Sequence, residues 1–153
     1  MCSPTDAEEQ SFIIRTLTMN DYDSMVKLWE DAGLPTRLRG RDSKASIEAQ
    51  MRMCPEFFVG AFADAQLVGT VIASSDGRKG WINRLAVHPK HRRRGVAKAL
   101  VAEAEKVLRR NGVEIFSALI MDHNRASKEL FKELGYEELE DVKYFSKRVN
   151  EEA

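Results

Sequence analysis

The sequence predicts a single α/β domain built on a mixed β-sheet, and three observations lead to this prediction. The chain has 153 residues, of which 43% are hydrophobic and 31% charged, as expected for a globular domain with one core. Short apolar runs separated by turn residues fill much of the first two thirds, whereas amphipathic helices follow residue 95. Hairpins early in the chain and strand–helix–strand connections later predict both antiparallel and parallel pairing.

The first part of the chain is expected to form four strands and two helices. Asn20 is a suitable residue to cap the first helix, and Gly33 is suited to end it. Pro55 stops the second helix, and Asp76-Gly77 indicates a turn between two strands. The strands are expected over 12–17, 56–63, 66–75 and 81–88, and the helices over 19–33 and about 44–53.

The second part is expected to add two helices and three strands. A helix with one apolar face starts at Val96 and ends before Asn111-Gly112. Residues 114–121 form a mostly apolar run, which predicts a strand that is buried on both faces. The helix over 124–135 carries an apolar stripe, and the chain then closes with two strands over 136–142 and 143–149. The predicted domain therefore has six or seven strands and four helices.

Charge and cysteine content limit the classes of partner and compartment. The 24 Lys and Arg residues balance the 24 Asp and Glu residues, which argues against a general attraction to nucleic acid or a membrane surface. No apolar run approaches the roughly 18 residues that span a bilayer. Cys2 and Cys54 do not make a disulfide framework, so a cytoplasmic protein is expected. Residues 1–10 are expected to be a mobile tail, and residues 11–150 the domain.

The stretch "AVHPKHRRRGVAK" (86–98) concentrates positive charge where a strand meets a helix. It could contact nucleic acid, bind a metal, cradle a phosphorylated small molecule, or be no more than a solvated charge cluster. The first turn of the helix has unpaired N–H groups at the positive end of the helix dipole, which suits a pyrophosphate. Gly95 and Ala97 keep the backbone accessible, and the charged rim consists of Arg92, Arg93, Arg94 and Lys98.

The other interpretations of this stretch have less support. His88-x-x-His91 has a superficial metal-binding spacing, but Pro89 lies between the two and no Cys or second carboxylate is near, which argues against zinc. No wider basic face supports nucleic-acid binding. The sequence therefore favours a phosphate cradle and no metal.

Two motifs resemble the Gcn5-related N-acetyltransferase (GNAT) superfamily. Arg92-x-x-Gly95-x-Ala97 matches the family signature Q/R-x-x-G-x-G/A, and "NRASKELFKELGYE" (124–137) is similar to the family's following N-x-x-(S/A)-x-x-L-(Y/F)-x-x-L-G-(F/Y) segment. The expected order of strands and helices also matches the family from end to end. The resemblance thus implies a single GNAT-type acyl-CoA N-acyltransferase domain.

The resemblance also implies a cofactor slot for acetyl-CoA, which serves as co-substrate without a metal. Backbone groups of residues 85–87 would contact the pantetheine arm and the acetyl carbonyl like an added strand. Backbone groups of residues 93–98 would hold the pyrophosphate, and a β-bulge in the 81–88 strand would open the slot. The expected cofactor-binding residues are Leu85, Ala86, Val87, Arg92, Arg93, Arg94, Gly95, Val96, Ala97, Lys98, Asn124 and Phe131.

The catalytic groups depart from the family pattern. Many members have a Tyr near the end of the second motif that protonates the leaving thiolate, but the matching residue is Phe131, which cannot donate a proton. Tyr136, Tyr144 or a water could replace it, and Tyr144 is preferred because the final strands border the cleft in this fold. No carboxylate lies in the 81–85 segment, so Asn83 could position a water as proton acceptor, or the amine could be deprotonated before it binds.

The resemblance implies transfer of an acetyl group to a primary amine by direct attack. The acceptor could be a protein N-terminus, a Lys side chain or a small-molecule amine, and the alternative is a non-catalytic acetyl-CoA-binding sensor. The loop that carries Arg37, Arg39, Arg41 and Lys44 is either solvated charge or a selector for an acceptor with an acidic group. Homodimers are frequent in the family, so a homodimer is one expectation.

Overall fold

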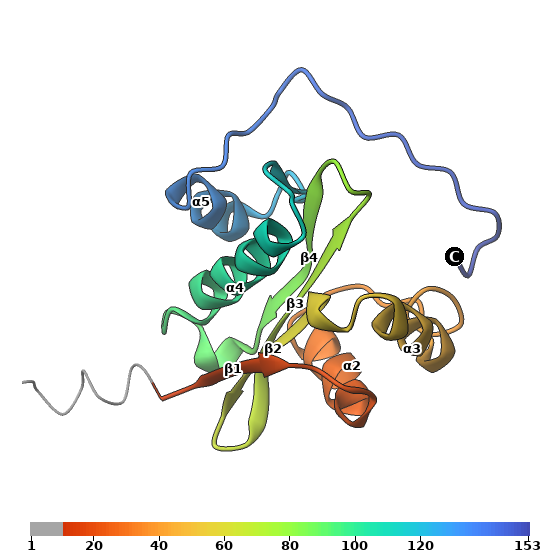
Figure 1. The fold of residues 1–153 in the computed structure, drawn as a ribbon, viewed down its shortest axis with the longest axis vertical. Helices are drawn as coiled ribbons and strands as arrows, with labels where there is room; N and C mark the ends of the chain where they lie inside the picture. The colour runs from red at the N-terminus through yellow and green to blue at the C-terminus, as the bar shows by residue number, and fades with distance from the viewer. Residues whose placement is uncertain (1–10) are drawn as a thin grey trace, which may run out of the picture.

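The computed structural model describes residues 11–153 and contains one five-stranded sheet between two layers of helices (Figure 1). The strands lie in the order β1-β2-β3-β4-β5. Helices α4 and α5 cover one face of the sheet, whereas α2 and α3 lie on the other side (Figure 1). The mixed α/β class predicted from the sequence is confirmed, and the expected tail over residues 1–10 lies outside the described residues.

The first four strands form an antiparallel meander, and the fifth is parallel to its neighbour. Short turns join β2 to β3 and β3 to β4, whereas β1 and β2 are joined through α2 and α3. Strands β4 and β5 are joined through helix α4, which supplies the crossover that parallel pairing requires. The strands are β1 (Ile13–Thr16), β2 (Phe58–Ala63), β3 (Gln66–Ser75), β4 (Gly80–Val87) and β5 (Phe116–Ala118).

The helices agree with their expected positions except at the first helix start. Asn20 is inside a short 3-10 turn, η1 (Met19–Asp21), and the residue that precedes helix α2 is Asp21, so the predicted Asn20 cap is wrong. Ser43 caps the next helix, because its side chain accepts a hydrogen bond from the Ser46 N–H at 3.2 Å. The α-helices are α2 (Tyr22–Asp31), α3 (Lys44–Met53), α4 (Val96–Arg110) and α5 (Arg125–Glu133), with further 3-10 turns η2 (Pro55–Phe57) and η3 (Pro89–His91).

The core lies on both faces of β2 and β3. Trp29 from α2 is fully buried on one face, and Leu100 and Leu108 from α4 are fully buried on the other. Gly69 in β3 lets α4 approach closely, because a Cβ there would lie 2.9 Å from side-chain atoms of Leu100 and Val96. This packing fixes the start of α4 against the end of β4.

The predictions for the end of the chain are wrong in two respects. Residues 116–118 alone form β5 and they are half-buried, so the expected strand over 114–121 is shorter and less buried than predicted. Residues 136–149 form no strand, and the described residues therefore hold five strands instead of six or seven. A strand needs a hydrogen-bonding partner as well as a suitable pattern, and no neighbouring strand accompanies this segment in the described part of the chain.

A buried carboxylate ties the first strand to the first helix. Asp21 accepts two hydrogen bonds from the Arg15 guanidinium, at 3.0 and 3.1 Å, and one from the Thr18 N–H at 2.9 Å. The hydrogen bonds from Arg15 are the main reason that the pKa of Asp21 lies below its usual value. The carboxylate is therefore the stable form in the folded protein at neutral pH.

Replacing Asp21 with Asn is expected to lower the free energy of unfolding by about 1–2 kcal/mol at neutral pH. The folded-state pKa lies below the unfolded value of about 4, so this stabilisation is present above the unfolded pKa and is lost as the pH falls through the folded one. Urea unfolding of both proteins at neutral pH and near pH 3 measures the difference. Asp23→Asn, at an exposed carboxylate, is the control, and a difference that does not shrink in acid would contradict the assignment.

Candidate functional site

A β-bulge interrupts β4 beside the centre of the sheet. Thr70 of β3 pairs with Ala86, and two residues later Ile72 pairs with Asn83, so Arg84 and Leu85 together face one residue of β3. Arg84 adopts a left-handed conformation with φ of 51°, which is uncommon for a residue with a side chain. The bulge expected from the sequence is present at this position.

The pairing of strands β4 and β5 ends just before the bulge. Their ladder joins Gly80–Ile82 to Phe116–Ala118 and goes no further. The His88 N–H donates to the Val68 carbonyl of β3 at 2.8 Å, so the backbone groups of the preceding residue, Val87, point to the opposite side. That side is open to a ligand because β5 has already turned away.

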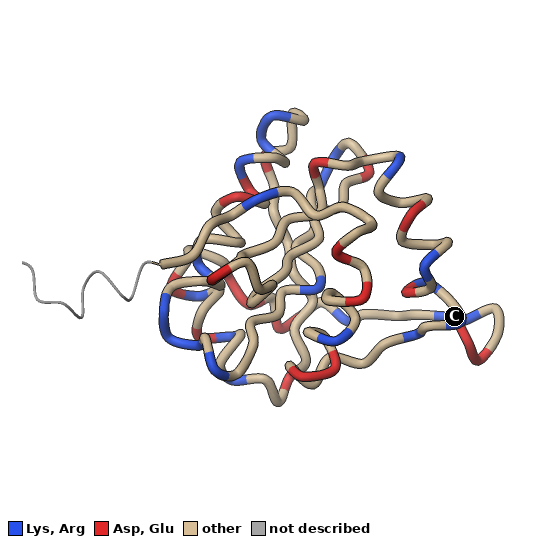
Figure 2. The backbone as a smooth tube through the Cα atoms, turned by 90° about the horizontal axis from the view of Figure 1, so that it is seen from below, with Lys and Arg blue, Asp and Glu red and all other residues tan. Residues whose placement is uncertain are grey.

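The start of α4 provides an anion-binding backbone next to this open edge. Gly95 precedes the helix with φ of 80°, a left-handed conformation that glycine adopts without steric cost. Gly95 has no side chain to cap the helix, so the first-turn N–H groups remain available for an anion. Arg93 also has a positive φ, of 64°, which curls the loop around the helix start. In Figure 2, the blue of Lys and Arg is concentrated where β4 passes into α4.

These elements surround a cavity of about 580 Å³. The end of α2, the strand β4 beyond the bulge, and the first turns of α4 and α5 form its walls. Ten of the twelve residues expected at the cofactor slot line it: Leu85, Ala86, Val87, Arg92, Arg93, Gly95, Val96, Ala97, Lys98 and Asn124.

The other two expected cofactor residues do not line this cavity. Arg94 lines a much smaller neighbouring cavity together with Phe12. Phe131 is 5% exposed, and its ring packs edge-on against the ring of Tyr136 at 4.9 Å between centroids. Phe131 therefore belongs to the packing between α5 and the rest of the domain.

Six residues that line the cavity lie outside the predicted cofactor-binding set. Ala126 and Leu130, four residues apart, belong to the apolar stripe predicted for this helix, and that stripe lines the cavity. The Asn124 side chain caps α5, because it accepts a hydrogen bond from the Ser127 N–H at 3.1 Å. This cap fixes the start of α5, so the helix turns its apolar face toward the cavity. Besides the ten predicted residues, the cavity is lined by Ala32, Leu34, His91, Ala126, Ser127 and Leu130.

The residues considered for proton transfer lie away from the cavity. The Asn83 amide donates to the Ser74 hydroxyl at 2.9 Å and does not line the cavity. Tyr144 is 73% exposed on the C-terminal segment. The Tyr136 hydroxyl donates to Glu105 at 3.0 Å, and burial raises its pKa far above the usual value, so it holds its proton at neutral pH.

The two histidines near the basic loop have different environments. His91 lines the cavity, and burial and the nearby positive charge of Arg94 lower its pKa, which favours the neutral imidazole. His88 accepts the Lys90 N–H at 3.2 Å, and its other ring nitrogen lies 3.7 Å from Asp31. Within residues 11–153, no group of three or more His, Cys, Asp or Glu residues is arranged to hold a metal ion.

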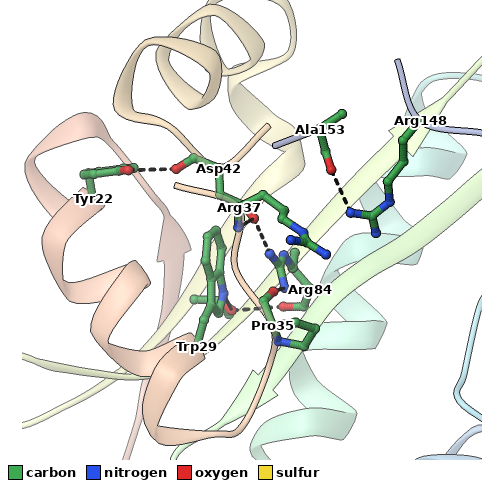
Figure 3. Close-up of polar contacts among 9 residues, drawn as sticks. Tyr22, Trp29, Pro35, Arg37, Asp42, Arg84, Arg148 and Ala153 are labelled. Carbon is green, nitrogen blue, oxygen red and sulfur yellow. Dashed lines mark hydrogen bonds and ion pairs between the residues drawn. The ribbon is translucent and has the colours of Figure 1, made fainter. Parts of the chain in front are cut away.

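A network centred on Arg84 fastens the loop over residues 34–43 to the bulge (Figure 3). The Arg84 guanidinium donates to Asp42 at 2.6 Å and to the Pro35 carbonyl at 2.7 Å, and it lies 4.6 Å from the centre of the Trp29 ring. The Trp29 indole donates to the Thr70 hydroxyl, which in turn donates to the Arg84 carbonyl, both at 3.0 Å. The loop, the core and the bulge are thus held as one unit.

The basic side chains of this loop are used in different ways. Asp42 accepts the backbone N–H of Arg37 at 2.7 Å, which shapes the turn. Arg39 lies 3.6 Å from the carboxylate of Glu152, and its side chain is 85% exposed. Arg41 and Lys44 are exposed. The loop therefore presents positive charge to solvent close to the bulge.

None of the helices in residues 11–153 combines the length and apolar character needed to cross a membrane.

Comparison with known proteins places the chain in a family. A model of the acetyltransferase (GNAT) family matches residues 21–136. An acetyltransferase of Photorhabdus laumondii is 32% identical over 137 residues, which are 89% of this chain and 94% of that protein. An acetyltransferase of Sodalis glossinidius is 31% identical over 140 residues, covering 91% and 96% of the two chains.

Solved structures show the same fold. The PaiA N-acetyltransferase of Thermoplasma acidophilum in complex with coenzyme A matches with a TM-score of 0.75 and 20% identity, over 88% of this chain and 94% of that chain. The aminoglycoside 6'-N-acetyltransferase AAC(6')-IG of Acinetobacter haemolyticus matches with a TM-score of 0.68 and 25% identity, over 90% and 99%. The matching family model, the relatives and the fold together establish that this chain belongs to the acetyltransferase (GNAT) family, whose members use acetyl-CoA as co-substrate.

Proposed function

We propose that this acetyltransferase binds acetyl-CoA in the 580 Å³ cavity and transfers the acetyl group to a primary amine. The pyrophosphate lies at the start of α4, on the N–H groups that follow Gly95. The pantetheine arm runs along residues 85–87 of β4, and the amine reaches the acetyl group beside the bulge. One observation carries this proposal. The uncapped N–H groups at the start of α4 and the unpaired edge of β4 beyond Ile82 line the same cavity.

Charge and backbone geometry support the position of the pyrophosphate. Arg92, Arg93 and Lys98 line the same cavity as the start of α4, so a doubly charged group there would meet both N–H donors and cations. At the other end, Leu34 and Leu130 give the cavity an apolar section that suits the carbon chain of the pantetheine arm.

The chemistry requires a neutral amine and a polarised thioester. The amine nitrogen attacks the carbonyl carbon, the carbon–sulfur bond breaks, and the coenzyme A thiolate leaves. A backbone N–H on the open side of β4 would stabilise the negative charge that develops on the carbonyl oxygen. Water takes the proton that the amine releases and supplies one to the thiolate, because Asn83, Tyr136 and Tyr144 do not line the cavity.

The loop beside the bulge bears on the choice of acceptor. Arg39 and Arg41 are exposed there, and the chain's own Glu152 is already close to Arg39. Positive charge beside the attack site favours an acceptor amine that also carries an acidic group. The solved neighbours that are named as aminoglycoside acetyltransferases support a primary amine as the reacting group.

Incubation of the protein with acetyl-CoA and a panel of amines tests the proposal. The panel should contain small polyamines, aminoglycosides, free lysine, and peptides with acidic or basic residues after a free N-terminus. We expect release of free thiol, followed with a thiol reagent, to depend on both substrates and to be fastest for an acidic acceptor. Tight acetyl-CoA binding without thiol release across the panel would instead favour the non-catalytic sensor.

A further inference from the structure

The carbonyl of Arg84, in the bulge of β4, is held by a side chain from the neighbouring strand. The Thr70 hydroxyl of β3 donates to this carbonyl at 3.0 Å, and the Trp29 indole N–H donates to the same hydroxyl at 3.0 Å. A carbonyl can only accept and an indole N–H can only donate, so the hydroxyl must direct its own hydrogen to Arg84. Thr70 and Trp29 are both completely buried. This chain of hydrogen bonds therefore has one direction and lies away from solvent.

The hydrogen bond from Thr70 sets the orientation of one peptide group on the cavity wall. The Arg84 carbonyl and the Leu85 N–H belong to the same peptide group, which is planar and trans, so the two point in opposite directions. Because the carbonyl points toward Thr70, the Leu85 N–H points away from Thr70. Leu85 lines the cavity, whereas Thr70 does not. The Thr70 hydroxyl thus aims the Leu85 N–H from outside the cavity.

The backbone at the bulge needs to be held because it is strained. Arg84 has φ of 51°, a conformation that a residue with a side chain keeps only where its surroundings stabilise it. Its guanidinium is bound to the loop over residues 34–43, and its carbonyl is bound to Thr70. Further along β4, the His88 N–H is fixed to the Val68 carbonyl at 2.8 Å. The Thr70 hydroxyl therefore holds the bulge end of the β4 segment that lines the cavity.

We propose that Thr70 is a positioning residue for acetyl transfer, whose hydroxyl, oriented by Trp29, aims the Leu85 N–H at the carbonyl oxygen of the acetyl group. This role rests on the acetyl-CoA site proposed above. When the amine attacks the carbonyl carbon, negative charge develops on that oxygen, and an N–H already in place stabilises it. Thr70 touches neither substrate, and it acts only through the direction of the N–H. The hydroxyl at position 70 is therefore required, whereas the methyl group is not.

The carbonyl stretching frequency of bound acetyl-CoA tests this role. A hydrogen bond to the carbonyl oxygen weakens the C=O bond and lowers its stretching frequency, which infrared spectroscopy resolves when the carbonyl carbon is isotopically labelled. We expect a higher frequency on Thr70→Val than on the wild-type protein, because the valine keeps the branched shape but has no hydroxyl. Thr70→Ser should keep the wild-type frequency. Equal frequencies on the wild-type protein and Thr70→Val would overturn the proposal.

Turnover should change through kcat and not through the binding of acetyl-CoA. With the fastest amine of the panel, we expect Thr70→Val to lower kcat about 10-fold and to leave the KM for acetyl-CoA within about twofold. A misdirected donor loses only part of the roughly 100- to 1000-fold in rate that complete removal of such a donor costs. Thr70→Ser should recover most of the lost kcat. A loss that serine does not recover would assign the effect to side-chain shape and contradict a role for the hydroxyl.

Two further variants separate positioning from stability. Thr70→Val leaves the Arg84 carbonyl and the Trp29 N–H without their partner, so it should also lower the melting temperature. Ile47→Val removes a buried methylene group from α3 and leaves the hydroxyl in place, so it should lose stability without a change in frequency or kcat. Trp29→Phe keeps an aromatic ring but removes the indole N–H, and we expect it to raise the frequency as Thr70→Val does. It provides the same test if Thr70→Val does not fold.

Calorimetry with coenzyme A and acetyl-CoA distinguishes failure of this role from failure of the proposed function. A wild-type protein that bound neither ligand would refute the acetyl-CoA site, and the role of Thr70 with it. Normal binding of both ligands by the wild-type protein and Trp29→Phe, with the same carbonyl frequency on each, would refute the role of Thr70 and Trp29 alone.

Discussion

Gly95→Asp is expected to lower the affinity for coenzyme A at least about 100-fold, which corresponds to about 2.7 kcal/mol. The new carboxylate would lie at the start of α4, where its oxygens accept the N–H groups that the pyrophosphate would otherwise use. It would also repel the pyrophosphate within a cavity whose walls limit screening by water. Isothermal titration calorimetry with coenzyme A measures the effect without the need for a known acceptor.

Gly112 offers a matched control at the other end of the same helix. Gly112 and Gly95 share a φ of 80°, and a Cβ at either position meets no atom within 4 Å. Gly112→Asp therefore imposes the same backbone strain, about 1 kcal/mol, without placing charge in the cavity. We expect Gly112→Asp to lose at least as much stability in thermal melts as Gly95→Asp, because its carboxylate faces the negative end of the helix dipole, whereas only Gly95→Asp loses coenzyme A binding. Equal binding by the two would show that the start of α4 is not the pyrophosphate site.

Asp42→Ala is expected to reduce the free energy of unfolding by about 3–5 kcal/mol, because it leaves the Arg84 guanidinium buried without its counter-charge. The Asp42 side chain is 5% exposed and that of Arg84 is 17% exposed. The variant also removes the acceptor for the Arg37 N–H, so the loop would loosen. Urea unfolding measures the loss of stability, and trypsin cleavage within residues 37–41 measures the loosening.

An exposed ion pair of almost the same length provides the comparison. Glu48 lies 2.7 Å from Arg52 on α3, but both side chains are well exposed. We expect Glu48→Ala to change the free energy of unfolding by no more than about 0.5 kcal/mol. If Asp42→Ala and Glu48→Ala had equal effects, burial would contribute nothing to the Arg84–Asp42 pair, and the loop would not depend on it.

Features with a local physical cause could be predicted from the sequence. The periodicity after Val96, the strand before it and the glycine between them are sufficient to predict a helix start that faces an anion. The hairpin between β2 and β3 likewise follows from two strand-like runs that only the short segment over 64–65 separates. In these cases the sequence signal and the structure it specifies lie within a few residues of each other.

Features that depend on distant contacts could not be predicted. Nothing near Arg84 indicates that its guanidinium would reach Asp42, because 42 residues separate them. Ala32 and Leu34 reach the cavity only because α2 packs across the sheet. The pattern over 143–149 predicts a strand, but the segment forms none, because strand formation depends on a partner that the pattern alone does not identify.

The network around Arg84 has a consequence for how the two substrates influence each other. The main chain of Arg84 forms the bulge, beside which we propose that the acetyl group lies, while its side chain holds the loop that we propose faces the acceptor. A ligand that orders the loop therefore restricts the bulge, and a ligand that fixes the bulge restricts the loop. The free energies of binding of acetyl-CoA and of the acceptor should then be linked, and thermodynamic reciprocity requires each to change the affinity of the other by the same factor.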